Sequence, residues 1–279
     1  MHLQTFSAPP RRLDPHLDVP APADGWTWPP TSVTLITGER EAILVDTLPA
    51  QADSRELADW IEATGTVLTT IFITHAHLDH YLGAATLLDR FPDARVVATA
   101  PTVRHIDDEI RSGAERTRYS AMFVDEIAST VALPEVLHTD RLDLEGHDVI
   151  VVTAGQSDHA DSSYLHLPGL GAVIVGDIAY NDVHCALMET DHDKRRAWID
   201  TLRGVRALQP TTVVTAHRRA DAPDDARVLS DTIAYLEQAD RLLAGGPSAA
   251  DFVGQMLTAH PTRLNTATLY YGAAVLGLP

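Results

Sequence analysis

The stretch VLTTIFITHAHLDHYLG, residues 67–83, runs from a continuous apolar segment directly into three histidines and an aspartate. Its first seven residues are rich in β-branched side chains and show no polar alternation, which is typical of a strand covered on both faces. His75, His77, Asp79 and His80 follow at once. The sequence therefore predicts a buried strand that delivers four potential ligands to the edge of a sheet.

The sequence around this stretch alternates between strand and helix patterns. Residues 32–37 and 42–47 predict an antiparallel hairpin whose second strand ends at Asp46, and residues 53–64 predict a helix capped by Asp53 or Ser54. A second group of strands is predicted at 148–155, 162–167, 172–177 and 211–217, with a helix at 194–208. This order indicates an α/β fold of two sheets packed face to face with helices outside them.

The predicted domain organisation is one main domain with additions. Residues 1–30 contain seven prolines, which remove backbone donors, so regular structure is improbable there and we expect an extended arm. Residues 31–279 are expected to form a single domain. It carries a helical insertion at about 101–130 and a helical tail at about 224–279.

Composition excludes several classes of protein. The chain has 21 Lys and Arg against 39 Asp and Glu, and a net charge of -18 repels polyanions, so no nucleic-acid partner is expected. No apolar run is long enough to cross a bilayer, and the N-terminus lacks the apolar core of a secretory signal. We expect a cytoplasmic protein without a membrane partner that acts on a small molecule. Nothing in the sequence indicates the oligomeric state.

Ligand-type side chains also end the other predicted strands. His159 follows the strand at 148–155, Asp177 closes the strand at 172–177, and His217 closes the strand at 211–217. If neighbouring strands bring these ends to one edge, five imidazoles and two carboxylates converge. A cation between them would relieve their repulsion and hold the histidines neutral.

His75, His77, Asp79 and His80 resemble the HxHxDH signature of the metallo-β-lactamase-fold hydrolases, and the three later residues match that family in order and spacing. The resemblance covers about residues 32–220. It implies an αββα sandwich of two mixed β-sheets flanked by helices, with two divalent metal ions. The implied first-metal ligands are His75, His77 and His159, the second-metal ligands are Asp79, His80 and His217, and Asp177 bridges both.

Zinc is the metal expected from imidazole and carboxylate ligands, with iron or manganese as alternatives. The sequence departs from the family in having Gly155-Gln156 where Gly-His is frequent, and Gln156 does not replace a ligand. The bridging Asp177 argues against a true β-lactamase. His77 stands where flavodiiron relatives have a glutamate.

The resemblance also implies roles around the metals. Two such ions would lower the pKa of a shared water and so create a nucleophile for a carbonyl carbon. Tyr180 is expected to donate to the developing negative charge, and Asp79 to pass a proton to the leaving alkoxide. Asp46 and Thr74 are expected to orient the imidazoles. The residues expected to contact substrate are Tyr119, Met122, Phe123 and His184.

The predicted function is hydrolysis of a small ester or lactone by a dinuclear metal-dependent hydrolase. A thioesterase similar to glyoxalase II is one alternative, although the tail offers only Arg263 to hold the carboxylates of glutathione. A mononuclear iron persulfide dioxygenase is another, because some proteins of this fold use two histidines and the aspartate on one iron. Ribonucleases share the fold, but the charge opposes that function, and a binding module without catalysis would be expected to lack ligands.

Overall fold

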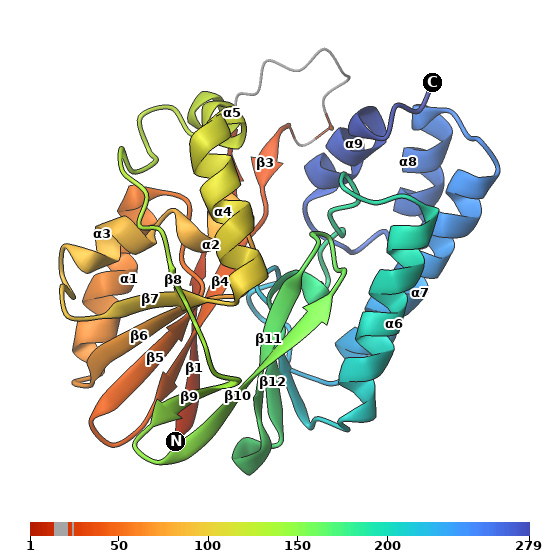
Figure 1. Cartoon of the computed structure of the whole chain (residues 1–279). Coiled ribbons are helices and arrows are strands. Elements are labelled where there is room, and N and C mark those ends of the chain that lie inside the picture. Colours follow the sequence, from red (N-terminus) through yellow and green to blue (C-terminus); the bar gives the residue numbers. More distant parts are fainter. Residues whose placement is uncertain (14–21, 24) are drawn as a thin grey trace.

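The computed structural model describes residues 1–13, 22–23 and 25–279. Two β-sheets lie face to face between two layers of helices (Figure 1). The first sheet has the order β1 (His2–Ala8), β4 (Thr31–Thr37), β5 (Glu41–Val45), β6 (Val67–Ile73), β7 (Arg95–Ala98) and β8 (Glu135–Val136). The second has the order β13 (Thr212–Val214), β12 (Ala172–Ile174), β11 (Ser162–Leu167), β10 (His147–Gly155) and β9 (Arg141–Leu144).

Both sheets are mixed. In the first sheet β1, β4 and β5 pair antiparallel, whereas β5 to β8 pair parallel. In the second sheet only β12 and β13 pair parallel, and the other neighbours are antiparallel. The expected αββα sandwich of mixed sheets flanked by helices is therefore confirmed.

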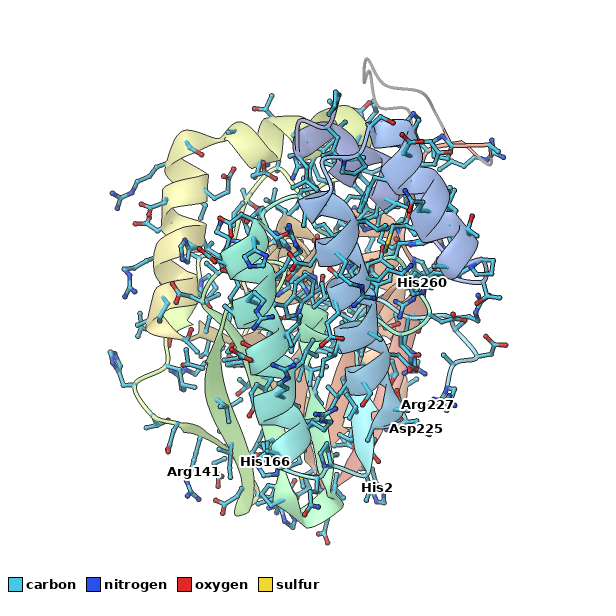
Figure 2. All side chains as sticks on the ribbon, turned by 90° about the vertical axis from the view of Figure 1, so that its right-hand side faces the viewer. His2, Arg141, His166, Asp225, Arg227 and His260 are labelled. Atoms are coloured by element: carbon cyan, nitrogen blue, oxygen red, sulfur yellow. The ribbon has the colours of Figure 1, made fainter. Side chains whose placement is uncertain are left out.

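The helices divide between the outer faces of the two sheets. The first sheet is covered by α1 (Gln51–Ala63) and α3 (Ala84–Leu88), on the left in Figure 1. The second is covered by α6 (His192–Ala207) and α7 (Arg227–Ala244), which stand side by side in Figure 2. The remaining helices are α2 (Leu78–Tyr81), α4 (Ala100–Ser112), α5 (Ala114–Met122), α8 (Ala249–Ala259) and α9 (Thr266–Val275).

Strand β6 is central to the first sheet, between β5 and β7, and all three run parallel. This position explains its continuous apolar sequence, because both of its faces are covered. Phe72 faces the core between the sheets, where it packs in one cluster with Ile43, Val97 and Leu165. The residues that follow β6 emerge at the end of the sandwich where α4, α5 and α9 lie (Figure 1).

The first prediction follows from this packing. Phe72→Ala is expected to lower the free energy of unfolding by about 3–5 kcal/mol, because it leaves a cavity where the side chain is fully buried. The midpoint of guanidinium denaturation measures the loss. Val67→Ala on the same strand is the control, since Val67 is 63% exposed and should change stability by less than about 0.5 kcal/mol. Equal losses in the two variants would contradict this view of the core.

Several local expectations are confirmed and two are wrong. Strands β4 and β5 form the predicted antiparallel hairpin. Helix α1 begins at Gln51 and has no side-chain cap, so the cap predicted at Asp53 or Ser54 is wrong. The absence of regular structure predicted for residues 1–30 is wrong for β1, which pairs along its whole length with β4. Its seven residues precede the first proline and keep every backbone donor.

A further two-stranded sheet joins β2 (Arg11–Arg12) to β3 (Thr27–Trp28) in the same N-terminal region. The rest of the predicted arm includes residues 14–21 and 24, which lie outside the described residues. The predicted domain boundaries stay a prediction. Among the described residues, no helix combines the length and apolar character that crossing a membrane requires.

Candidate metal centre

Asp46 organises the loop that carries the histidine motif. It follows β5 in the left-handed backbone region, with φ of 63°, which aspartate tolerates better than most residues. Its Oδ1 accepts from the Thr74 amide at 2.8 Å, and its Oδ2 accepts from the Thr74 hydroxyl at 2.8 Å and from His80 Nδ1 at 2.9 Å. The Asp46 carboxylate thus fixes both the start of the motif and the imidazole at its end.

The ring nitrogens that face away from the centre each have an acceptor. His75 Nδ1 lies 2.9 Å from the Thr74 hydroxyl, whose own proton goes to Asp46, so His75 donates. His217 Nδ1 donates to the Pro30 carbonyl at 3.2 Å, and His80 Nδ1 donates to Asp46. These bonds place the protons on Nδ1 and leave the Nε2 lone pairs toward the interior, as a metal ligand requires.

One group of potential ligands consists of Asp79, His80 and His217, whose nearest ligand atoms all lie within 4.8 Å of one another. All three side chains are buried. His217 Nε2 is 3.3 Å from Asp79 Oδ2, and His80 Nε2 is 3.6 Å from the same oxygen. This is the second-metal set expected from the resemblance, and the structure brings its three members together.

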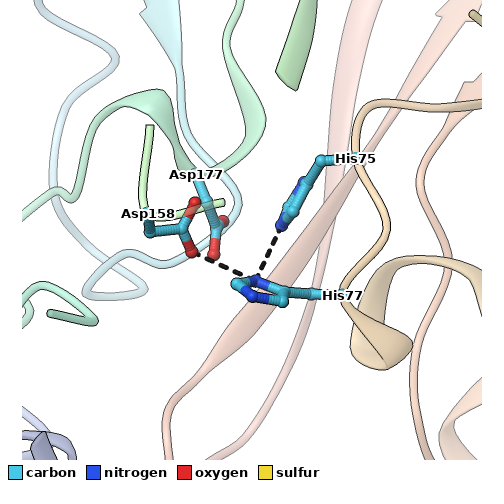
Figure 3. A group of neighbouring side chains, drawn as sticks. All are labelled: His75, His77, Asp158 and Asp177. Atoms are coloured by element: carbon cyan, nitrogen blue, oxygen red, sulfur yellow. Dashed lines mark hydrogen bonds and ion pairs between the residues drawn. The ribbon is translucent and has the colours of Figure 1, made fainter. Parts of the chain in front are cut away.

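A second group consists of His75, His77, Asp158 and Asp177, again within 4.8 Å (Figure 3). The two imidazoles and two carboxylates point toward one another. His75 Nε2 is 3.1 Å from His77 Nδ1, and His77 Nδ1 is 3.2 Å from Asp158 Oδ2. Asp158 is 1% exposed and was missed by the sequence reasoning, which assigned this position to the residue after it.

The structure does not bring His159 into that group. Its ring centroid is 6.1 Å from that of His75, and its Nδ1 donates to the Ala160 carbonyl at 2.6 Å. Together with His77 and Glu189 it forms a separate, more exposed cluster. Glu189 was also missed by the sequence reasoning, and its carboxylate accepts from His77 Nε2 at 3.2 Å. This contact holds the His77 proton on Nε2 and turns Nδ1 toward Asp158.

Asp177 lies against both groups. Its Oδ2 is 3.5 Å from His80 Nε2 and 3.2 Å from His217 Nε2, and the residue also belongs to the group of His75 and His77. A glycine before it makes this approach possible. Gly176 has φ of 52°, and a Cβ there would lie 2.8 Å from the Thr74 hydroxyl. The chain therefore passes close to the motif just where Asp177 must reach it.

Tyr180 links the two carboxylates of the first group. Its buried hydroxyl lies 2.9 Å from Asp158 Oδ2 and 2.9 Å from Asp177 Oδ2. Burial, together with Asp158 and Asp177, raises the pKa of Tyr180 well above its usual range, so it stays a neutral donor. The single phenolic proton is shared between two carboxylates, so negative charge remains on Asp158 and Asp177 that a cation would offset.

The pKa values show how strongly the carboxylates act on the imidazoles. Burial and the neighbouring His80 and His77 hold the pKa of His75 well below its usual range. Burial opposes the charged form of His217 as well, but Asp177 and Asp79 raise its pKa to about 10. Asp177, Asp79 and Asp46 likewise raise the pKa of His80 against burial. The carboxylates therefore attract positive charge, and a metal ion would take the place of these protons.

Two buried polar atoms without hydrogen-bond partners bear on whether these residues fit metal ions. His80 Nε2 and Asp177 Oδ1 have no hydrogen-bond partner, although burial of an unpaired polar atom costs about 1–3 kcal/mol. Both belong to side chains whose other polar atoms have partners. Imidazole nitrogen and carboxylate oxygen are the donors that zinc, iron and manganese accept. The donor set thus fits divalent metal at both groups.

The residues expected to contact substrate have different surroundings. Tyr119, Met122 and His184 line a cavity over the centre, and Tyr119 also donates to Asp79 Oδ1 at 3.2 Å. Phe123 is not among the lining residues. It stacks on Tyr119 with a centroid separation of 5.9 Å and is 2% exposed, so it packs in the core.

The histidines outside the motif set are spread over the molecule. His2 and His166 are labelled at the lower end of Figure 2, and His260 lies beside Tyr235 with ring centroids 4.8 Å apart. His184 is fully buried and its Nδ1 lies 3.0 Å from the Tyr235 hydroxyl. Among the described residues, none of these four belongs to a group of potential metal ligands.

The second prediction concerns Asp46. Asp46→Asn is expected to weaken metal binding about 10- to 100-fold, because His80 loses a charged acceptor while asparagine keeps the shape and tolerates positive φ. Metal content after dialysis against graded chelator measures the effect. Asp200→Asn is the control, since Asp200 is 74% exposed and its carboxylate pairs with Arg203. Unchanged metal retention and turnover in Asp46→Asn would contradict the role of Asp46 in positioning the His80 imidazole.

Comparisons with known proteins agree with the fold described above. A family model described as the metallo-beta-lactamase superfamily matches residues 26–217. A metallo-beta-lactamase from Pontibacter korlensis superposes with a TM-score of 0.57 at 20% identity, covering 75% of this chain and 88% of that one. A metallo-beta-lactamase from Pseudomonas aeruginosa in a mono-zinc form gives 0.59 at 14% identity, covering 85% and 92%. At these identities the two structures show a shared fold.

One curated protein was also matched in sequence. It is the hydroxyacylglutathione hydrolase of Photorhabdus laumondii subsp. laumondii, 31% identical over 86 residues. The match spans 31% of this chain and 31% of that protein, so the chain covers about a third of the relative's length.

Proposed function

Because the chain belongs to the metallo-β-lactamase superfamily, we propose that it is a dinuclear metal-dependent hydrolase of a small ester or lactone. The observation that carries the proposal is the position of Asp177, whose carboxylate lies against both groups of potential ligands. A single carboxylate shared in this way suits two cations held side by side.

The residues assigned to the two ions follow from the contacts. His75 Nε2, His77 Nδ1 and Asp158 would hold the first ion, with Asp158 in the role first expected of His159. Asp79, His80 and His217 would hold the second, and Asp177 would contact both. Zinc is proposed for both positions, and iron or manganese would also accept these donors.

When bound, two divalent cations would lower the pKa of a water molecule and polarise a substrate carbonyl. The chain's own part is to place and move protons. Asp79 Oδ1 accepts from Tyr119, and we assign this carboxylate the transfer of a proton to the leaving alkoxide. Tyr180 was expected to donate to the substrate oxygen, but its bonds to Asp158 and Asp177 support a positioning role instead.

A thioesterase acting on acylated glutathione is the second candidate. Its support is the local similarity to a hydroxyacylglutathione hydrolase. A cytoplasmic location and a small-molecule substrate, without a nucleic-acid or membrane partner, complete the proposal.

Metal quantification on protein purified without chelator, followed by a substrate panel, tests the proposed function. We expect about two divalent ions per chain and hydrolysis of homoserine lactones or simple aryl esters. Faster turnover of S-lactoylglutathione would select the thioesterase. One iron per chain with oxygen uptake on a persulfide would contradict hydrolysis, and preferential cleavage of a cephalosporin would contradict the choice of esters and lactones.

A further inference from the structure

A cavity of about 250 Å³ lies over the candidate metal centre. His77, Asp79, Asp158, Asp177 and His217 all contribute to its lining, so it opens directly on both groups of ligands. Most of the other lining residues come from residues 26–29, helix α5, residues 184–189 and helix α9. The cavity therefore continues from the reacting centre toward parts of the chain that hold no metal ligand.

The walls away from the centre are mainly apolar. Trp28 packs against Tyr119 with ring centroids 5.2 Å apart, and Met122 lines the same side from helix α5. Ala267 and Val275 face the cavity from helix α9. Aromatic, methionine and small aliphatic side chains favour binding of a hydrocarbon chain, because contact with them removes its apolar surface from water.

Among the described residues, the charged side chains in these walls leave no unpaired cation. Arg118 is the only Lys or Arg among the described lining residues, and it forms an ion pair with Glu115 and a hydrogen bond to the Tyr271 hydroxyl. Glu189 lines the cavity too. Its carboxylate accepts a hydrogen bond from His77 Nε2 at 3.2 Å. A substrate carboxylate would meet two glutamates and no unpaired cation.

We infer that this cavity binds an uncharged acyl or alkyl chain of the substrate and discriminates against chains that end in an anion. The inference rests on the proposed function, because the chain must be attached to the ester or lactone carbonyl at the metal centre. It also separates the two candidate functions, since glutathione presents two carboxylates away from the thioester bond.

The first test is a series of p-nitrophenyl esters from acetate to decanoate. Burial of each methylene is worth up to about fourfold in kcat/KM, so activity should rise by roughly two- to fourfold per methylene until the cavity is filled. The matched pair p-nitrophenyl octanoate and the mono-p-nitrophenyl ester of suberic acid isolates the charge. We expect the suberate to be at least about tenfold poorer, because its terminal carboxylate has no cationic partner.

A variant then links the preference to this cavity. Ala267→Leu adds three carbons to the α9 wall, where Ala267 is 3% exposed, and should move the optimum chain length shorter by two or more carbons. Ala250→Leu on helix α8 is the control, since Ala250 is exposed and does not line this cavity. If Ala267→Leu does not fold, Met122→Trp narrows the opposite wall.

Binding of decanamide to the protein gives a readout that does not need turnover. Tryptophan emission should change on binding, because Trp26 and Trp28 line the cavity, and Ala267→Leu should weaken the affinity at least about fivefold. Equal activity along the ester series, or preference for the suberate, would overturn the inference. Failure to hydrolyse any ester or lactone while decanamide still binds would refute the proposed function and leave the chain-binding cavity standing.

Discussion

Replacement of Asp177 by asparagine is expected to lower kcat/KM by roughly a thousandfold or more and to reduce metal content from about two ions per chain to fewer than one. The carboxylate contacts His80 and His217 and also belongs to the group of His75 and His77. Asparagine keeps the shape but removes the negative charge, so under the proposed assignment both metal positions would lose a charged ligand. Elemental analysis after gel filtration and steady-state kinetics on the best ester measure the two effects.

The control for this variant is Asp140→Asn, because the Asp140 side chain is 80% exposed and lies 3.8 Å from Arg141 at its nearest. It should bind metal and turn over substrate like the unmodified protein. In the metal-free protein Asp177 accepts from the Tyr180 hydroxyl, and although burial opposes its charge, the imidazoles of His217 and His80 lower its pKa, so the metal-free variant should be less stable to heat at neutral pH. Full metal content in Asp177→Asn would show that this carboxylate does not join the two positions.

Asp158→Asn is expected to release one ion and to lower kcat/KM by on the order of a hundredfold, whereas His159→Gln should keep both ions. The two residues are neighbours in sequence but differ in surroundings. Asp158 is buried against His77 and Tyr180, while His159 bonds to the Ala160 carbonyl and lies near Glu189. Metal content of the two variants, purified in parallel, compares the ligand assignments directly.

The reverse outcome would restore His159 as the first-metal ligand and exclude Asp158. Asp158→His provides a further comparison. It should bind more metal than Asp158→Asn, because an imidazole can also act as a metal ligand.

Tyr180→Phe tests whether the Tyr180 hydroxyl positions the carboxylates of Asp158 and Asp177. It should weaken metal affinity while leaving kcat of the metal-saturated variant nearly unchanged, whereas loss of a donor to the developing negative charge would lower kcat.

The layered fold and the grouping of most candidate ligands were accessible from sequence because they depend on local patterns. The apolar run ending at Ile73 predicts a covered strand, and the residues after it must emerge at one edge of the sheet. Asp177 and His217 follow strands in the same way. Such placements need only strand periodicity and the rule that neighbouring strands share an edge.

Strand patterns did not indicate which of Asp158 and His159 is the candidate ligand of the first metal. Both follow strand β10 in a loop, and no periodicity tells which of two adjacent side chains faces inward. The contact with Tyr180 supports Asp158, and that residue lies 22 positions away. Glu189 was missed for the same reason, since its role depends on a contact with His77 across 112 positions.

The N-terminal strand illustrates a different failure. Prolines between residues 9 and 30 suggested an irregular segment, and the seven residues before them were included in it. Strand β1 owes its position to pairing with β4, which the sequence of β1 alone does not encode. Edge strands depend on the partner that is present, so composition is a poor guide to them.

His217 Nδ1 donates to the Pro30 carbonyl, so the candidate metal centre depends on a residue just outside the region of resemblance, residues 32–220. A chimera that transplants only residues 32–220 onto another scaffold would lose this acceptor for the His217 imidazole. It would also lose Trp28 and helix α9, which come from opposite ends of the chain and meet over the same reacting centre. A chimera should therefore keep the N-terminal residues and helix α9 together with the region between them.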